Sequence, residues 1–219
     1  MKILFTGATS FTGYWIVQSL IESEHKIIAP IRFNIASYQD GMRKIRLQNL
    51  LNTVEIIENC SFGNENFIKL IENNNFDLLC HHAACVKDYR SPDFDPIHAL
   101  NENTNNLKPI LTKLANKNLQ AVILTGSVFE QNEGAGDNTP KAFSPYGLSK
   151  GLTYDVFKYY TALLNIPLFK FTIPNPFGPL EEERFCSYLH KKWSQNETAI
   201  VSVPHYIRDN IHVSLLAQT

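Results

Sequence analysis

Short apolar runs and amphipathic segments alternate regularly along most of this chain. We expect strands at 2–5, 26–31, 54–57, 76–82, 119–126 and 167–173, and helices at 12–24, 39–51, 66–73, 99–117 and 146–165. Such alternation is typical of a parallel sheet that is covered by helices on both faces. The sequence therefore predicts an α/β fold with a doubly wound, Rossmann-type parallel sheet, in which ligands bind at the carboxyl ends of the strands.

The composition, charge and apolar runs of the chain argue against a nucleic-acid or a membrane partner. The 219 residues are 44% hydrophobic and 19% charged, a globular composition, and the net charge of −1 gives no reason to expect a nucleic-acid partner. No apolar run approaches the roughly 20 residues of a membrane helix, and the N-terminus leads straight into a strand without a signal-peptide pattern. We therefore expect a cytoplasmic protein with no membrane partner. A doubly wound domain at 1–173 would precede a small, more irregular portion at 174–219.

The four cysteines, at positions 60, 80, 85 and 186, form no C-x-x-C pair. We interpret them as reduced thiols of a cytosolic protein. The alternative is a metal site built from Cys80, His81, His82 and Cys85. Neighbouring side chains on a strand point to opposite faces, so His81 and His82 cannot easily face one ion, and we expect no metal.

The stretch FTGATSFTG, at 5–13, follows the first strand and opens the first helix. This is the context of a dinucleotide-binding turn: Gly7 suits the tight turn, and Gly13 lets the helix approach the strand closely. The helix N-terminus then offers free N–H groups to a pyrophosphate. Ser10 stands where a third glycine is usual; its hydroxyl could bond a phosphate oxygen, while its Cβ could push the cofactor outward. A glycine turn without a ligand is the alternative.

The stretch SPYGLSK, at 144–150, places Tyr146 and Lys150 four residues apart, so that their side chains share one face of a helix. A lysine ammonium near a phenol lowers the pKa of the phenol, which suits proton transfer. This spacing alone is mostly a chance occurrence. Here the preceding strand ends in LTGS, at 124–127, which places Thr125 near the same crevice.

These motifs, taken in order, resemble those of the extended short-chain dehydrogenases/reductases, in particular the NAD(P)-dependent epimerase/dehydratase family that acts on nucleotide sugars. TGATSFTG resembles the family's T-G-x-x-G-x-x-G turn, and HHAA, at 81–84, resembles its H-x-A-[AG] segment. Further resemblances are NENTNN (101–106), LTGSVFE (124–130), SPYGLSK (144–150), IPNPFGP (173–179) and RDNIHV (208–213). Family members commonly continue beyond this point, so we expect the substrate-binding portion at 174–219 to be partial, either in a naturally short member or in a truncated chain.

The resemblance implies a role for each matching residue. Thr125, Tyr146 and Lys150 would be catalytic, with Tyr146 exchanging a proton with a sugar hydroxyl. Ser127, Asn175 and Arg208 would bind the substrate, Arg208 through its diphosphate. The cofactor would contact Gly7, Thr9, Ser10, Phe11, Thr12, Gly13, Arg32, Asn59, Cys60, His82, Ala83, Ala84, Asn103, Tyr146 and Lys150. The long helix, 146–165, pairs with its copy in relatives, which makes a homodimer plausible.

The residue at the end of the second strand gives separate information on whether the cofactor is NAD or NADP. An NAD enzyme usually has an acidic residue there to hold the ribose 2′-hydroxyl, whereas this chain has Arg32, which could meet a 2′-phosphate. We therefore favour NADP over NAD. Asn59 replaces an aspartate that many relatives have near the adenine, and Glu130 follows Phe129 where relatives often have Tyr-Gly.

Three hypotheses remain at this stage. The first is an epimerase, dehydratase or reductase that acts on a nucleotide-linked sugar. The second is a short-chain reductase of another carbonyl substrate, and the third is a non-catalytic dinucleotide-binding protein. The set of Thr125, Tyr146 and Lys150 favours catalysis, because binding alone needs no tyrosine acid.

Overall fold

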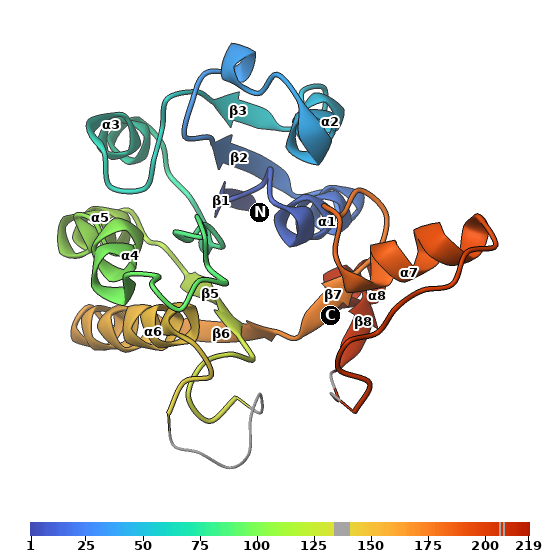
Figure 1. Ribbon diagram of the computed structural model, residues 1–219. Coiled ribbons are helices and arrows are strands. Elements are labelled where there is room, and N and C mark those ends of the chain that lie inside the picture. Colours follow the sequence, from blue (N-terminus) through green and yellow to red (C-terminus); the bar gives the residue numbers. More distant parts are fainter. Residues whose placement is uncertain (134–140, 206, 208) are drawn as a thin grey trace.

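The computed structural model describes residues 1–133, 141–205, 207 and 209–219, and its centre is a six-stranded parallel sheet (Figure 1). The strands lie in the order β3-β2-β1-β4-β5-β6. Their bounds are β1 Lys2–Thr6, β2 Lys26–Pro30, β3 Glu55–Ile57, β4 Leu78–His81, β5 Ala121–Ser127 and β6 Leu168–Ile173. This order defines a doubly wound sheet, and it confirms the fold class that the strand–helix alternation predicts.

Helices cover both faces of the sheet. Figure 1 shows α3, α4 and α5 on one side of the sheet and α1 and α2 on the other. The helices that follow the first five strands are α1 Phe11–Glu22, α2 Gly41–Leu50, α3 Glu65–Asn73, α4 Pro96–Asn103, α5 Leu107–Ala115 and α6 Pro145–Leu163, with a short 3₁₀ turn, η1, at Ile35–Ser37. Alternate residues of the strands belong to two apolar clusters, one on each face of the sheet. Leu4 and Ile28 pack with α3, α5 and α6, whereas Ile3 and Ile27 pack with α1.

The segment 99–117, expected as one helix, is two helices in the structure. Residue Asn106, between α4 and α5, has a left-handed backbone with φ of 53°. Its side-chain amide donates to the Gly63 carbonyl at 2.8 Å. Asparagine tolerates this conformation better than most residues, which explains the break inside an otherwise continuous helical pattern.

The C-terminal part contains more regular structure than the sequence suggests. Two short parallel strands, β7 Asn175–Phe177 and β8 Asn210–His212, form a second sheet, and α7 Phe185–Ser194 and α8 Val213–Gln218 accompany them. Figure 1 places this part beside α1. The Trp15 indole of α1 donates to the Pro179 carbonyl at 3.1 Å, which ties the two parts together.

Within the described part of the chain, no helix combines the length and the apolarity needed to cross a membrane.

Candidate active site

The glycine turn lies at the carboxyl end of β1, directly against the segment that follows β4. Gly7 has a φ of +78°, and a Cβ there would lie 2.8 Å from the Ala83 amide nitrogen. A Cβ at Gly13 would lie only 2.3 Å from the Gly7 carbonyl oxygen. Both glycines are therefore required by space, and Gly7 also by its backbone conformation. The β1/β4 boundary is the point where the strand order reverses, and ligands bind there in doubly wound sheets.

Ser10 is the N-cap of α1 in the structure. Its φ is −72°, so this position needs no glycine for its backbone, and its hydroxyl oxygen accepts from the Gly13 amide at 3.1 Å. Among the described residues, the amides of Phe11 and Thr12 make no hydrogen bond. The turn thus keeps two free N–H groups at a helix N-terminus, and the space left by Gly7 and Gly13 completes a cradle that fits a pyrophosphate.

His82 fixes the two polar side chains of the turn. Its Nε2 atom lies 3.0 Å from the Ser10 hydroxyl and 3.0 Å from the Thr12 hydroxyl. Burial, followed by the positive charge of Lys150, lowers the pKa of His82 to about 3, so the ring is neutral at neutral pH. The serine that replaces the middle glycine is therefore held by a neutral imidazole as well as by the helix.

His81, which the sequence interpretation did not include among the site residues, organises the base of the site. Its Nε2 donates to the Asn103 carbonyl at 3.2 Å, so its Nδ1 accepts from the Thr6 hydroxyl at 3.1 Å. The Thr6 oxygen in turn accepts from the Ala83 amide at 3.0 Å. Burial is the main reason that the pKa of His81 falls to about 3. The H-x-A-[AG] resemblance contained the signal, because its histidine is His81.

Asn103 and Ala84 lie in the same region. The Asn103 side chain accepts from the Cys85 amide at 2.8 Å and donates to the Thr153 hydroxyl at 3.2 Å. It therefore ties the loop after β4 to α6, and its buried amide is fully engaged within the protein. Ala84, in the loop after β4, is half-buried.

The residues expected at the adenosine end gather after β2 and β3. Arg32 is exposed immediately after β2, and among the described residues it makes no ion pair. Asn59, with a left-handed backbone, donates its amide to the Phe33 carbonyl at 3.3 Å. The Cys60 side chain is buried in the core and burial raises its pKa to about 12, so Cys60 can reach a ligand only through its backbone.

The helix that carries Tyr146 and Lys150 begins where its sequence dictates. Ser144 caps it by accepting from the Gly147 amide at 3.1 Å, and Pro145 occupies the first turn. A Cβ at Gly147 would lie 1.9 Å from the Phe129 carbonyl oxygen. Glycine at this position therefore lets the loop after β5 pack against the first turn of α6.

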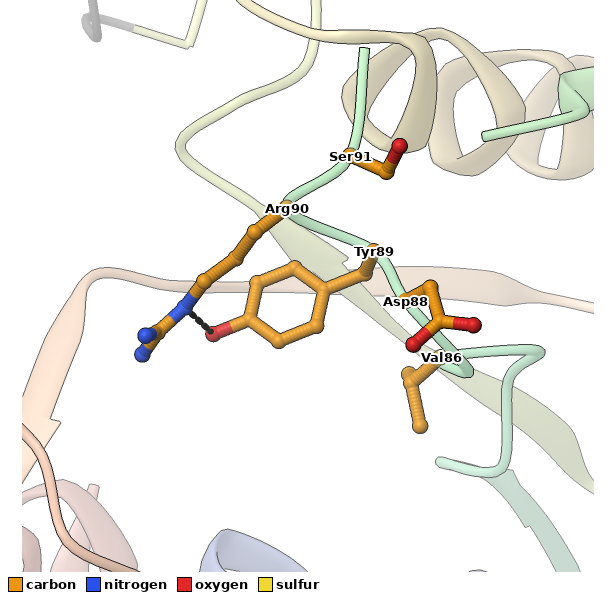
Figure 2. Close-up of a pocket in the computed structure, with 5 residues that line it drawn as sticks. All are labelled: Val86, Asp88, Tyr89, Arg90 and Ser91. Atoms are coloured by element: carbon orange, nitrogen blue, oxygen red, sulfur yellow. Dashed lines mark hydrogen bonds between the residues drawn. The ribbon is translucent and has the colours of Figure 1, made fainter. Parts of the chain in front are cut away.

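Aromatic residues from the loop after β4 hold the Tyr146 ring. Tyr89 and Phe94 contact it edge-to-face, with ring centroids 5.3 and 6.0 Å away. Next to them, an open cavity of about 630 Å³ is lined by Val86, Asp88, Tyr89, Arg90 and Ser91. Figure 2 shows the Arg90 side chain folded against Tyr89, where its Nε donates to the hydroxyl at 3.1 Å. No motif in the sequence pointed to Tyr89 or Arg90.

Lys150 and Thr125 are both buried, at 4% and 7% exposure. Burial lowers the pKa of Lys150 to about 8, and nearby Lys170 lowers it too, while the Glu130 carboxylate opposes the shift. Thr125 lies near the carboxyl end of β5, as expected. Lys150 is thus an ammonium with a weakened hold on its proton, one helical turn after Tyr146.

The expected lowering of the Tyr146 pKa is wrong, because the pKa of this phenol is raised. Burial, then Tyr89 and Glu130, raise the pKa of this phenol, and only Arg184 opposes them. The expectation overlooked the cost of burying a phenolate, which outweighs the effect of the Arg184 cation. Tyr146 is therefore a neutral phenol at neutral pH.

Two of the three expected substrate-binding residues, Ser127 and Asn175, are described, and they lie on different strands, β5 and β7. The Ser127 hydroxyl accepts from the Phe129 amide at 3.2 Å. The Asn175 amide donates to the Asn210 side chain where β7 meets β8. Arg208 lies outside the described residues. A further arginine, Arg184, lies 6.0 Å from the centre of the Phe11 ring, and its charge acts on the pKa of Tyr146.

Arg46 joins the glycine turn to the C-terminal part. This fully buried side chain donates to the Thr9 carbonyl at 2.9 Å and to the Leu180 carbonyl at 2.6 Å, and it pairs with Glu182. Three guanidinium nitrogens thus fix the glycine turn and the C-terminal part relative to one another.

Within residues 1–133, 141–205, 207 and 209–219, no group of three or more His, Cys, Asp and Glu side chains could hold a metal ion. His81 and His82 are engaged in the two separate networks described above, and Cys80 is a buried free thiol.

The model of the NAD dependent epimerase/dehydratase family matches residues 3–218. The chain belongs to this family. It is therefore an enzyme of the NAD-dependent epimerase/dehydratase type, as the ordered motifs suggested. A search of curated protein sequences gave no match.

Solved structures of other family enzymes share this fold. The UDP-glucuronic acid 4-epimerase of Bacillus cereus, in complex with UDP-glucuronic acid and NAD, is 21% identical, with a TM-score of 0.74 over 99% of this chain and 71% of that one. The UDP-glucose 4-epimerase of Thermotoga maritima, with UDP-glucose, is 18% identical, with a TM-score of 0.75 over 100% of this chain and 71% of that one. The ADP-L-glycero-D-manno-heptose-6-epimerase of Helicobacter pylori is 17% identical, with a TM-score of 0.73 over 99% and 71%.

Proposed function

We propose that this enzyme acts on a nucleotide-linked sugar, which it epimerises, dehydrates or reduces through hydride transfer at a sugar carbon. The observation that carries the proposal is that Tyr146 and buried Lys150 lie at the start of α6, a helix that contacts β5, whose carboxyl end carries Thr125. A protein that only binds a dinucleotide has no use for a tyrosine acid at that place. The relatives with UDP-sugars in their structures support the substrate class.

The residues of the glycine turn would hold the cofactor. Its pyrophosphate fits the cradle above Gly7, where the amides of Phe11 and Thr12 are free to donate. Lys150 would bind the ribose next to the nicotinamide. When bound, the nicotinamide accepts a hydride from the sugar carbon and can return it.

The chain's own residues would manage the proton. Tyr146 would take the proton of the sugar hydroxyl at the reacting carbon, and Thr125 would donate a hydrogen bond to the same oxygen. The Tyr146 phenol would first lose its proton to water, and the Lys150 ammonium, once drawn to the ribose beside it, would stabilise the phenolate. Proton abstraction would thus depend on binding.

The substrate would lie between the cavity of Figure 2 and the C-terminal part. The sugar would lie against Tyr89 and Ser127, and Asn175 would contact it from β7. Arg184 and Arg208 would bind the nucleotide phosphates, because guanidinium groups suit phosphate oxygens. The division into a cofactor part at 1–173 and a substrate part at 174–219 belongs to this proposal.

The cofactor preference is a separate proposal. NAD is present in the Bacillus cereus relative, and the family is defined as NAD dependent. Exposed Arg32 could pair with a 2′-phosphate, so we propose that NADP is accepted and favoured.

A homodimer through α6 is also proposed. Exposed apolar side chains lie along this helix at Leu148, Tyr159 and Leu163, which are 40%, 65% and 58% exposed. We expect a cytoplasmic enzyme without a membrane partner. Light scattering of wild type and of Leu163→Glu would show a dimer and a monomer, respectively; a monomeric wild type would contradict the dimer.

The test of function is turnover by a matched pair of proteins. Wild type and Tyr146→Phe are incubated with a nicotinamide cofactor and a panel of UDP-, dTDP-, GDP- and ADP-sugars, and products are followed by proton NMR. We expect product from wild type and none from Tyr146→Phe, with equal cofactor affinity in calorimetry. Turnover that persists in Tyr146→Phe would refute the catalytic assignment.

A further inference from the structure

A buried ion pair lies directly behind the strand end that carries Thr125. The Glu130 carboxylate, in the loop after β5, has a side chain only 1% exposed. One of its oxygens accepts from the Ser127 amide at 2.6 Å, and the other lies 2.6 Å from the Lys170 ammonium of β6. Both oxygens are thus fixed, one by the end of β5 and one by the adjacent strand.

Lys170 is held from three directions. Besides Glu130, it pairs with Glu133, which also accepts from the Thr172 hydroxyl at 3.1 Å. The Tyr154 ring of α6 lies 4.7 Å from the Lys170 ammonium. The two opposing carboxylates outweigh the effect of burial and raise the pKa of Lys170, so Lys170 stays charged.

The backbone makes room for this pair. A Cβ at Gly126 would lie 2.6 Å from the Lys170 Cε and 2.9 Å from a Glu130 carboxylate oxygen. Burying two charges costs free energy that their attraction often only balances, so a stabilising role alone is a weak reason for the arrangement. The pair of Glu130 and Lys170, for which Gly126 leaves the space, therefore suggests a role beyond stabilising the fold.

The pair lies against the helix that carries the proton-handling residues. The Lys170 ammonium is 4.7 Å from the Tyr154 ring, one turn of α6 after Lys150, and Phe129, next to Glu130, packs against Gly147 in the first turn of α6. Glu130 raises the pKa of both Lys150 and Tyr146, whereas Lys170 lowers that of Lys150. The other titratable neighbours of Lys150 are His81 and His82, and both are neutral at neutral pH. Those of Tyr146 are Tyr89 and Arg184. Glu130 is thus the one anionic group among these neighbours of Lys150 in the described residues.

We propose that Glu130, anchored by Lys170 and the Ser127 amide, is a positioning residue that keeps Lys150 cationic in its buried place beside the cofactor ribose. Lys150 needs this support because burial weakens its hold on the proton. The proposal rests on the proposed function for the ribose contact. The electrostatic link between Glu130, Lys170 and Lys150 is independent of that function.

Two isosteric variants test the link with opposite signs. Glu130→Gln removes the supporting negative charge, so the titration midpoint of Lys150 should fall below about 8. Lys170→Met removes the opposing positive charge, so the midpoint should rise. A shift on the order of one unit in each direction is the size expected from a nearby charge at a buried group. A merely structural role would lower the melting temperature in both variants without opposite shifts.

The midpoint is read by carbon NMR of lysine labelled at Cε, with Lys150 assigned by the Lys150→Arg variant. Glu72→Gln, which breaks the half-exposed Lys113–Glu72 pair, is the control and should leave the midpoint unchanged. Equal midpoints in wild type, Glu130→Gln and Lys170→Met would overturn the proposal.

Cofactor binding is then measured against pH in the same proteins. NAD affinity should fall as pH rises through the Lys150 midpoint, earlier in Glu130→Gln and later in Lys170→Met. Midpoints that shift while the affinity profiles stay superimposed would refute the ribose role. Absence of NAD binding in the wild type would instead refute the proposed function and leave the NMR result standing.

Discussion

Replacing Gly13 by alanine tests how much the close packing of the glycine turn contributes to stability, apart from the gain in helix propensity. A Cβ at Gly13 would lie 2.3 Å from the Gly7 carbonyl oxygen and 2.7 Å from the Ser10 hydroxyl, so α1 would have to move away from the turn. At Gly151, inside α6, a Cβ would meet nothing within 4 Å. Both positions are helical, so alanine gains up to about 1 kcal/mol of helix propensity at either one. Gly151→Ala is therefore a matched control.

The two substitutions should change stability in opposite directions. We expect Gly151→Ala to raise the free energy of unfolding by roughly 0.5–1 kcal/mol. Gly13→Ala should lower it by about 1–3 kcal/mol, the usual cost of forcing extra volume into packed structure. At about 2–4 °C per kcal/mol for a chain of this size, the melting temperatures should move up by a few degrees and down by up to about 12 °C.

Thermal unfolding followed by circular dichroism, with and without NAD, measures the change in stability and the change in NAD affinity in one assay. A ligand that binds the folded protein raises its melting temperature, and a tenfold loss of affinity removes about 1.4 kcal/mol of that stabilisation when NAD is in excess. We expect NAD to protect wild type and Gly151→Ala more than Gly13→Ala. A Gly13→Ala protein that melts at the wild-type temperature and gains the same protection would refute the space argument.

Three further predictions follow from buried or exposed charges. Arg46→Met should lower the free energy of unfolding, measured in urea, by roughly 3 kcal/mol, because it leaves the Thr9 and Leu180 carbonyls without their donor. An unchanged urea midpoint of unfolding would show that Arg46 does not hold the glycine turn to the C-terminal part. Arg32→Gln should reduce NADP affinity about tenfold and leave NAD affinity unchanged in calorimetry; equal losses for both cofactors would contradict the 2′-phosphate contact. His81 and His82 have pKa values of about 3 in the folded protein, so the unfolded chain binds more protons as pH falls. The free energy of unfolding should therefore decrease from about pH 6.5 towards pH 3, with a shallower slope in His81→Asn; the same slope in both proteins would contradict the burial argument.

The parts of the fold set by local pattern were predictable. The strand–helix alternation gave the six strands and the class of sheet, because apolar runs and amphipathic helices leave clear periods in a sequence. The break at Asn106 was not predictable, because it depends on the distant Gly63 carbonyl. The strands β7 and β8 were missed for a similar reason: each has three residues, too few for a pattern, and each forms only by pairing with the other.

The candidate site divides in the same way. Gly7, Gly13, Tyr146 and Lys150 carried spacing signals, because a turn and a helix face are local features. The raised pKa of Tyr146 could not be predicted from the sequence, because it results from burial and from residues distant in sequence. The Glu130 ion pair could not be foreseen either, because its partner lies forty positions away on β6.

The most direct test of the central claim is calorimetric titration of the purified 219-residue protein with NAD and with NADP. We expect saturable, one-to-one binding of a nicotinamide dinucleotide in wild type, with loss of binding in Gly7→Ala, whose Cβ would lie 2.8 Å from the Ala83 amide. A folded wild-type protein that binds neither cofactor would contradict the cofactor site, and with it the proposed hydride transfer.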